Sequence, residues 1–261
     1  MTDGDSTSAS GGLRRRGEMP LAEHLREIRS RLLRAGGALV VGAVAGYAVF
    51  PVGLGLLLAP YCEAVGSMDR CDLVVLSPLD PFFVRLRTAA VLGIVVAAPV
   101  LLYQVWRFVR PGLTRQERRA LLPFVLLSQV MFAAGIAFAA WIVPRGLGIL
   151  LDLGGDGISP LLGAREYLSF LLTMGLAFGV VFELPLVLAF LVLTGVLSAR
   201  GMRDFRRYAV VINVIAAAIV TPTGDAVTLL FVAGPMLLFY ELAIGFAVIV
   251  ERSRRRRQGS R

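Results

Sequence analysis

Residues 167–196 read Tyr-Leu-Ser-Phe-Leu-Leu-Thr-Met-Gly-Leu-Ala-Phe-Gly-Val-Val-Phe-Glu-Leu-Pro-Leu-Val-Leu-Ala-Phe-Leu-Val-Leu-Thr-Gly-Val, and Glu183 is the only charged side chain among them. A helix needs about 20 mostly apolar residues to cross the roughly 30 Å hydrocarbon core of a bilayer. We therefore expect this segment to be a membrane-spanning helix.

Five further apolar segments surround it, at residues 35–58, 82–106, 120–143, 208–220 and 226–250. The whole chain of 261 residues is 57% hydrophobic and 17% charged, and its mean hydropathy is +0.75. This composition excludes a large soluble catalytic domain. The sequence predicts an all-α membrane protein with six transmembrane helices. The fifth is short, about 20 Å long, and prolines inside several segments predict kinked helices.

Arginine placement predicts the orientation. All 27 basic residues are arginines, and 22 of them fall on the side of the two termini against five on the other. Because arginine beside a span stays on the cytoplasmic side, we expect both termini to be cytoplasmic. The arginines flank apolar runs and form no basic face of a soluble domain, so nucleic acid is not expected as a partner. We divide the chain into a disordered tail at 1–19, a membrane domain at 20–251 and a basic tail at 252–261.

Two cysteines, Cys62 and Cys71, lie in the first loop on the side opposite the termini. In a bacterial membrane that side faces an oxidising compartment, so a disulfide between the two cysteines is chemically permitted. Two unlinked thiols are the alternative. His24 is the only histidine, so no Cys/His metal framework is expected.

Two carboxylates are expected on the cytoplasmic surface. Glu27 lies in the amphipathic segment 20–31, where an i,i+4 pair with Arg31 would account for it structurally. Glu117 follows Thr114 with the spacing of a capping box, which is likewise a structural explanation. The functional alternative is that the two carboxylates jointly hold guanidinium groups of a partner.

Three acidic residues lie in or beside the later apolar segments. A carboxyl group at the depth of Glu183 is costly and is by default a functional candidate, although a hydrogen bond to a neighbouring helix would be a structural explanation. Glu241 is similar but lies nearer the cytoplasmic end. Asp225 ends the turn Thr-Pro-Thr-Gly-Asp that begins at Thr221, and it could simply cap the next helix.

An ordered set of motifs resembles the TatC family, the multispanning core of the twin-arginine protein translocase. The motifs are the segment 20–31 with His-Leu-Arg-Glu-Ile-Arg at 24–29, Ser-Pro-Leu-Asp-Pro-Phe-Phe at 77–83, Ala-Pro-Val-Leu-Leu-Tyr-Gln-Val-Trp-Arg-Phe at 98–108, Glu-Arg-Arg at 117–119, Tyr-Leu-Ser-Phe at 167–170, Phe-Glu-Leu-Pro at 182–185 and Thr-Pro-Thr-Gly-Asp at 221–225. The resemblance runs from about residue 20 to residue 250.

The resemblance implies a receptor in the cell (inner) membrane, without enzymatic activity or cofactor. Such a receptor binds the Arg-Arg signal peptides of folded proteins and assembles, in several copies within membrane lipid, with single-span partners of the TatA and TatB type. The proton-motive force would drive transport. By motif position, Glu27 and Glu117 would contact the signal arginines, and His24 and Arg29 belong to the same binding motif.

The resemblance also implies that Glu183 takes the place of the family's intramembrane glutamate, and Asp225 that of its acidic residue after the fifth span. Two departures occur. Gln116 stands where a histidine is frequent, and Leu229 stands where some members carry a polar residue that helps to seat TatA or TatB. The alternative function is a proton-coupled small-molecule transporter with Glu183 and Glu241 as its relay.

Overall fold

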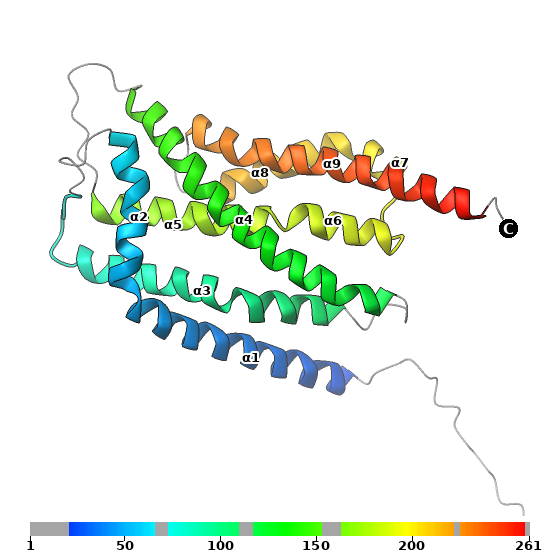
Figure 1. Ribbon diagram of the computed structural model, residues 1–261, viewed down its shortest axis with the longest axis horizontal. Helices are drawn as coiled ribbons and strands as arrows, with labels where there is room; N and C mark the ends of the chain where they lie inside the picture. Colours follow the sequence, from blue (N-terminus) through cyan, green and yellow to red (C-terminus); the bar gives the residue numbers. More distant parts are fainter. Residues whose placement is uncertain (1–20, 66–72, 110–116, 153–162, 222–224, 259–261) are drawn as a thin grey trace, which may run out of the picture.

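The computed structural model describes residues 21–65, 73–109, 117–152, 163–221 and 225–258. Within these ranges the chain is almost entirely helical, and the helices run mostly side by side (Figure 1). They are α1 (Leu21–Ala48), α2 (Phe50–Val65), α3 (Asp80–Val109), α4 (Glu117–Asp152), α5 (Ala164–Val181), α6 (Leu184–Leu193), α7 (Ala199–Asp204), α8 (Arg206–Val220) and α9 (Ala226–Gln258). The all-α fold class is confirmed.

By length and composition alone, fewer than the six expected spans are identified in the described part of the chain. In the described part of the chain, four spans are long and apolar enough to cross a membrane: α3, α4, α5 continued by α6, and α9. A fifth is added if α1 and α2 are counted together. Helix α8 has 15 residues and is about 22 Å long, so it is shorter than the hydrocarbon core.

The first span differs from its expected form. The apolar run 35–58 is not one straight helix, because the axis bends by 77° between α1 and α2. Pro51 is the second residue of α2, where it has no N–H to donate to the Tyr47 carbonyl one turn earlier. The amphipathic segment 20–31 is not a separate interfacial helix, since it forms the first turns of α1. Helix α2 turns across the bundle and packs against α4.

Glycines allow α1 and α3 to pack with their backbones in close contact. A Cβ atom added to Gly46 would lie 2.6 Å from the Ala89 carbonyl oxygen, and one added to Gly93 would lie 2.5 Å from the Ala43 nitrogen. Gly42 faces the backbone of Gly93 in the same way. Small residues four apart on one face are the usual means by which membrane helices approach closely.

The largest buried cluster lies where α4, α5, α8 and α9 meet. Phe178, Ala217 and Val232 are each fully buried in it. Helix α4 runs diagonally across its neighbours in Figure 1 and contacts α2, α3, α5, α6 and α9. Its 36 residues extend over about 54 Å, so it reaches from one end of the bundle to the other.

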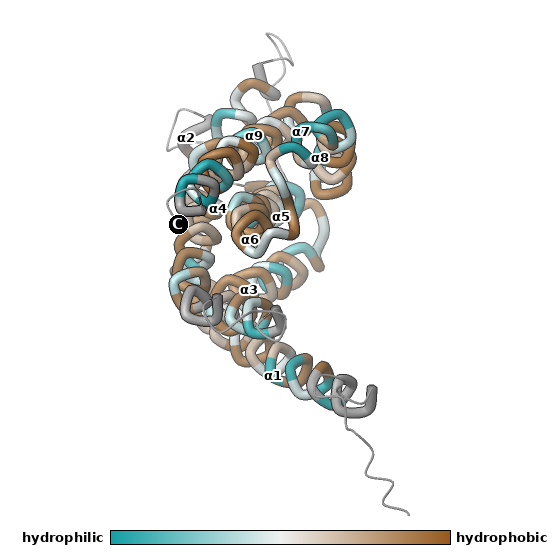
Figure 2. The backbone as a smooth tube through the Cα atoms, turned by 90° about the vertical axis from the view of Figure 1, so that its right-hand side faces the viewer, coloured by the Kyte–Doolittle hydropathy of each residue, from teal (hydrophilic) through white to brown (hydrophobic). Residues whose placement is uncertain are grey.

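The two ends of the bundle differ in charge. One end contains the start of α1, the end of α3, helix α7 and the end of α9. Figure 2 views the molecule from this end and shows hydrophilic segments on α7 and α9. Its described arginines are Arg26, Arg29, Arg31, Arg34, Arg107, Arg200, Arg203, Arg206, Arg207, Arg252, Arg254 and Arg256. The other end has Arg85, Arg87, Arg145 and Arg165. Helix α9 continues to Gln258, so the basic segment after residue 251 begins as a helix.

Candidate functional site

Glu27 and Glu117 belong to the arginine-rich end of the bundle. Glu27 lies in the second turn of α1, and Glu117 is the first residue of α4. Arg31, one turn after Glu27, donates a hydrogen bond of 3.5 Å to the Gln104 carbonyl near the end of α3. The start of α1 therefore lies beside the end of α3, and α4 begins a few residues further along the chain.

Not all residues of the candidate signal-binding set can be described. The side chains of His24, Glu27 and Glu117 lie outside the described part of the structure, as does Gln116. Arg29 is described and is exposed on α1.

Glu183 lies at the break between α5 and α6. Its backbone N–H donates to the Val180 carbonyl, and its own carbonyl accepts from the Val187 N–H. Pro185 follows within the first turn of α6, where a missing N–H costs no helical hydrogen bond. The backbone of Phe182 and Glu183 stays in the right-handed helical region, so the break leaves no irregular loop in the membrane.

The Glu183 carboxyl group has one strong partner. The Ser128 hydroxyl of α4 donates to Oε2 over 2.6 Å, and Ser128 itself is fully buried. The other carboxyl oxygen, Oε1, is buried and has no hydrogen-bond partner among the described residues. The same is true of Nε2 of Gln129, the residue after Ser128. An unpartnered oxygen at this depth leaves Glu183 able to accept a further donor.

Asp225 and Glu241 have structural partners. The Thr228 N–H donates to Oδ1 of Asp225 over 2.7 Å, so Asp225 caps α9. Glu241 of α9 accepts from Arg206 Nε at the start of α8, at 2.5 Å, and both side chains are partly exposed. Glu241 therefore belongs to the arginine-rich end and is paired there with a cation.

Three further positions named from the sequence can be placed. Leu229 is partly buried and packs against the main core, as an apolar residue should. Cys62 on α2 is disulfide-bonded, and Cys71 lies outside the described residues. No group of three or more histidine, cysteine or acidic side chains that could hold a metal occurs in the described part of the chain.

Comparison with known proteins identifies the family. The family model described as Sec-independent protein translocase protein (TatC) matches residues 23–235. The chain belongs to the TatC family. TatC proteins are components of a protein translocase and are not enzymes.

Individual TatC relatives agree with this result. The chain is 40% identical to TatC of Frankia casuarinae over 235 residues, which are 87% of this chain and 65% of that longer relative. It is 38% identical to TatC of Xylanimonas cellulosilytica, covering 93% of this chain and 88% of the relative. For TatC of Aquifex aeolicus the identity is 36%, covering 91% of this chain and 98% of the relative.

Solved TatC structures share the fold. A crystal structure described as the twin-arginine translocase receptor TatC in DDM superposes with a TM-score of 0.77 at 36% identity, covering 86% of this chain and 99% of that one. A second crystal structure of the same receptor gives a TM-score of 0.75 at 34% identity, covering 87% and 98%. The helix arrangement of this TatC chain is therefore that of its family.

Sequence reasoning missed Ser128. Its signal is the polar pair Ser128-Gln129 inside the apolar run of α4, opposite an acidic residue on another span. The sequence alone does not say which helices are neighbours, so the pairing of Ser128 with Glu183 needed the fold.

Proposed function

We propose that this TatC chain is the membrane receptor for the paired-arginine signal peptides of folded proteins, and that Glu27 and Glu117 contact the two signal arginines. The observation that carries the proposal is that both residues occupy positions at one end of the bundle, on helix α1 and at the start of helix α4. The match to the TatC family over most of the chain supports it.

We propose a topology of six crossings with both termini in the cytoplasm. Helix α8 is the short fifth crossing, and α1 is the first crossing with α2 lying across its far end. The excess of arginine at the end that contains both termini supports this orientation. Residues 1–19 then form a cytoplasmic tail and 20–251 the membrane domain, and the basic segment 252–261 continues α9 into the cytoplasm.

Arginine recognition requires fixed acceptors, because a guanidinium group stays charged at any accessible pH and has no acceptor of its own. A carboxylate can accept two parallel N–H groups from one arginine, and lysine cannot reproduce this geometry. Arg26 and Arg29 flank Glu27 on α1, so a signal must compete with them for the carboxylate. Such competition rejects basic sequences that are wrongly spaced.

Crosslinking tests this proposal. Full-length chain in inverted membrane vesicles is given a signal peptide that carries a photoreactive residue beside its Arg-Arg pair. Glu27→Ala and Glu117→Ala are expected to abolish crosslinking without reducing membrane insertion. Glu166→Ala, which removes an exposed carboxylate at the start of α5, is the matched control and is expected to leave crosslinking unchanged. Unchanged crosslinking in both test variants would refute the roles of Glu27 and Glu117.

We further propose that this chain works in several copies together with TatA-type and TatB-type single-span proteins, and that the proton-motive force drives transport. Membership of the translocase family supports the existence of such partners. Co-purification of tagged chain with single-span proteins from native membranes tests it, and recovery of the chain alone would refute it. The comparisons do not favour the alternative of a small-molecule transporter.

A further inference from the structure

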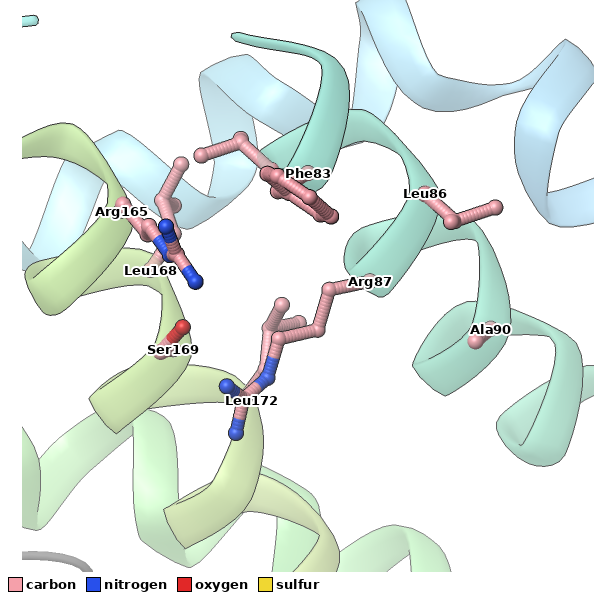
Figure 3. A pocket seen from close by; sticks show the side chains of 9 residues that line it. Phe83, Leu86, Arg87, Ala90, Arg165, Leu168, Ser169 and Leu172 are labelled. Atoms are coloured by element: carbon pink, nitrogen blue, oxygen red, sulfur yellow. The ribbon is translucent and has the colours of Figure 1, made fainter. Parts of the chain in front are cut away.

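A small cavity of about 220 Å³ opens between α3 and α5, at the end of the bundle opposite Glu27. Helix α3 contributes Phe83, Arg87 and Ala90, which share one face at i, i+4 and i+7. Helix α5 contributes Arg165, Ser169 and Leu172, which are spaced in the same way. In Figure 3 the guanidinium groups of Arg87 and Arg165 and the Ser169 hydroxyl group all project toward this cavity.

The cavity has more positive than negative charge. Arg87 donates to the Thr173 hydroxyl over 3.0 Å and has no carboxylate partner among the described residues. Arg165 lies 3.5 Å from Asp80, and its side chain remains about half exposed, at 49%. Two guanidinium groups therefore share one described carboxylate.

Neither of the acidic side chains nearby, Asp80 and Glu166, lines the cavity. Asp80 already accepts a hydrogen bond of 2.8 Å from the Ser77 N–H. Glu166, the adjacent acidic residue on α5, folds back against Gly163. The Ser169 hydroxyl has no hydrogen-bond partner among the described residues, so it is available as a donor next to the two arginines.

The lining combines charged and apolar residues. Arg87 lies seven residues after the start of α3 at Asp80, which is about 10 Å along the helix. Leu86 and Ala90, which face the same cavity, are exposed. A ligand seated here would meet both cations and apolar surface.

We propose that this cavity binds an anionic phospholipid, with its phosphate held by Arg87, Arg165 and the Ser169 hydroxyl group and one acyl chain along Leu86 and Ala90. Arginine is suited to phosphate because its planar fork donates two parallel hydrogen bonds. The cavity is smaller than the roughly 300 to 1,000 Å³ of most small-molecule sites, which fits a single headgroup better than a whole metabolite. The apolar part of the lining favours a lipid over a free anion.

Native mass spectrometry of the purified full chain in detergent tests this proposal. Phosphatidylglycerol and phosphatidylcholine with the same acyl chains are added separately to delipidated protein. We expect the double variant Arg87→Gln/Arg165→Gln to reduce phosphatidylglycerol affinity at least about tenfold, because two charge-assisted contacts are lost. Arg145→Gln is the matched control, since Arg145 lies at the same end but over the Trp141 ring of α4. It is expected to retain the binding.

Two further measurements separate a lipid site from the alternatives. Ala90→Phe fills the apolar wall without removing a charge, and it is expected to weaken phosphatidylglycerol binding even if the arginine variant does not fold. Inorganic phosphate is expected to displace the lipid only at far higher concentration. Equal binding of the two lipids, unchanged binding in Ala90→Phe, or displacement by phosphate at the lipid's own concentration would overturn the proposal.

Discussion

Replacing Gly93 by alanine tests the close packing of α1 on α3. The added methyl group would lie 2.5 Å from the Ala43 nitrogen, whereas ordinary contacts begin at about 3.4 Å. The two helices would therefore have to separate by about 1 Å along a seam that also includes Gly42 and Gly46. Overpacking of this kind costs about 1 to 3 kcal/mol of unfolding free energy.

Gly37→Ala provides the control for this measurement. Gly37 lies in α1, and a Cβ added there has no atom within 4 Å. Alanine in an open helical position stabilises by about 0.5 to 1 kcal/mol relative to glycine. The two substitutions make the same chemical change, so the difference between their unfolding free energies reports the effect of packing alone.

Thermal unfolding of the purified variants in detergent measures the effect. A loss of 2 kcal/mol corresponds to a midpoint lowered by about 4 to 8 °C in a chain of this size. Export of a reporter with a paired-arginine signal, in cells that lack their own TatC, is expected to fall as well, because α1 carries Glu27. If Gly93→Ala were as stable as Gly37→Ala, the reasoning about the seam would be refuted.

Other substitutions test the contacts of Glu183 and Asp225. Glu183→Gln keeps an acceptor for the Ser128 hydroxyl group and should lower the unfolding midpoint less than Glu183→Ala or Ser128→Ala. Each of the two alanine variants is expected to lose about 1 to 3 kcal/mol of unfolding free energy. Equal loss of stability in Glu183→Gln and Glu183→Ala would contradict the hydrogen-bond explanation. Asp225→Ala removes the cap of α9 and should cost about 1 kcal/mol, whereas Asp225→Asn should retain it. An Asp225→Ala variant that unfolds like the unsubstituted chain would show that the cap contributes nothing, and a reporter assay on Asp225→Asn separates stability from a need for charge.

Hydropathy predicted the existence of the long helices well. The segments 82–106, 120–143 and 226–250 all lie inside α3, α4 and α9. An apolar run of that length can satisfy its backbone in lipid only as a helix. The ends were predicted poorly, because the helices continue into polar sequence such as Arg252, where hydropathy falls but backbone hydrogen bonding does not.

The bends could not be predicted from proline alone. Pro51 and Pro185 lie just after the two breaks in the helical path, whereas Pro99 and Pro235 lie within continuous helices. These prolines occur in similarly apolar sequence. At Pro51 the difference is which neighbour each helix packs against, since α1 lies along α3 while α2 turns onto α4.

In the candidate site too, features that depend on local sequence were predictable, and contacts between helices were not. Glu183 was predictable because a charged residue is rare in an apolar run. Its partner Ser128 was not, because a serine in a membrane helix commonly bonds the backbone of its own helix. The sequence left open whether Asp225 is only a cap, and in the structure its Oδ1 accepts a hydrogen bond from the Thr228 N–H and so caps α9.

The oblique course of α4 has a mechanical consequence. A helix that crosses a set of nearly parallel helices and is joined to most of them acts as a diagonal brace, because sliding the others past one another would break its contacts. Helix α1 is joined almost only to α3. Helix α4 therefore resists sliding among the central helices, whereas α1 is held in place mainly by its close packing on α3.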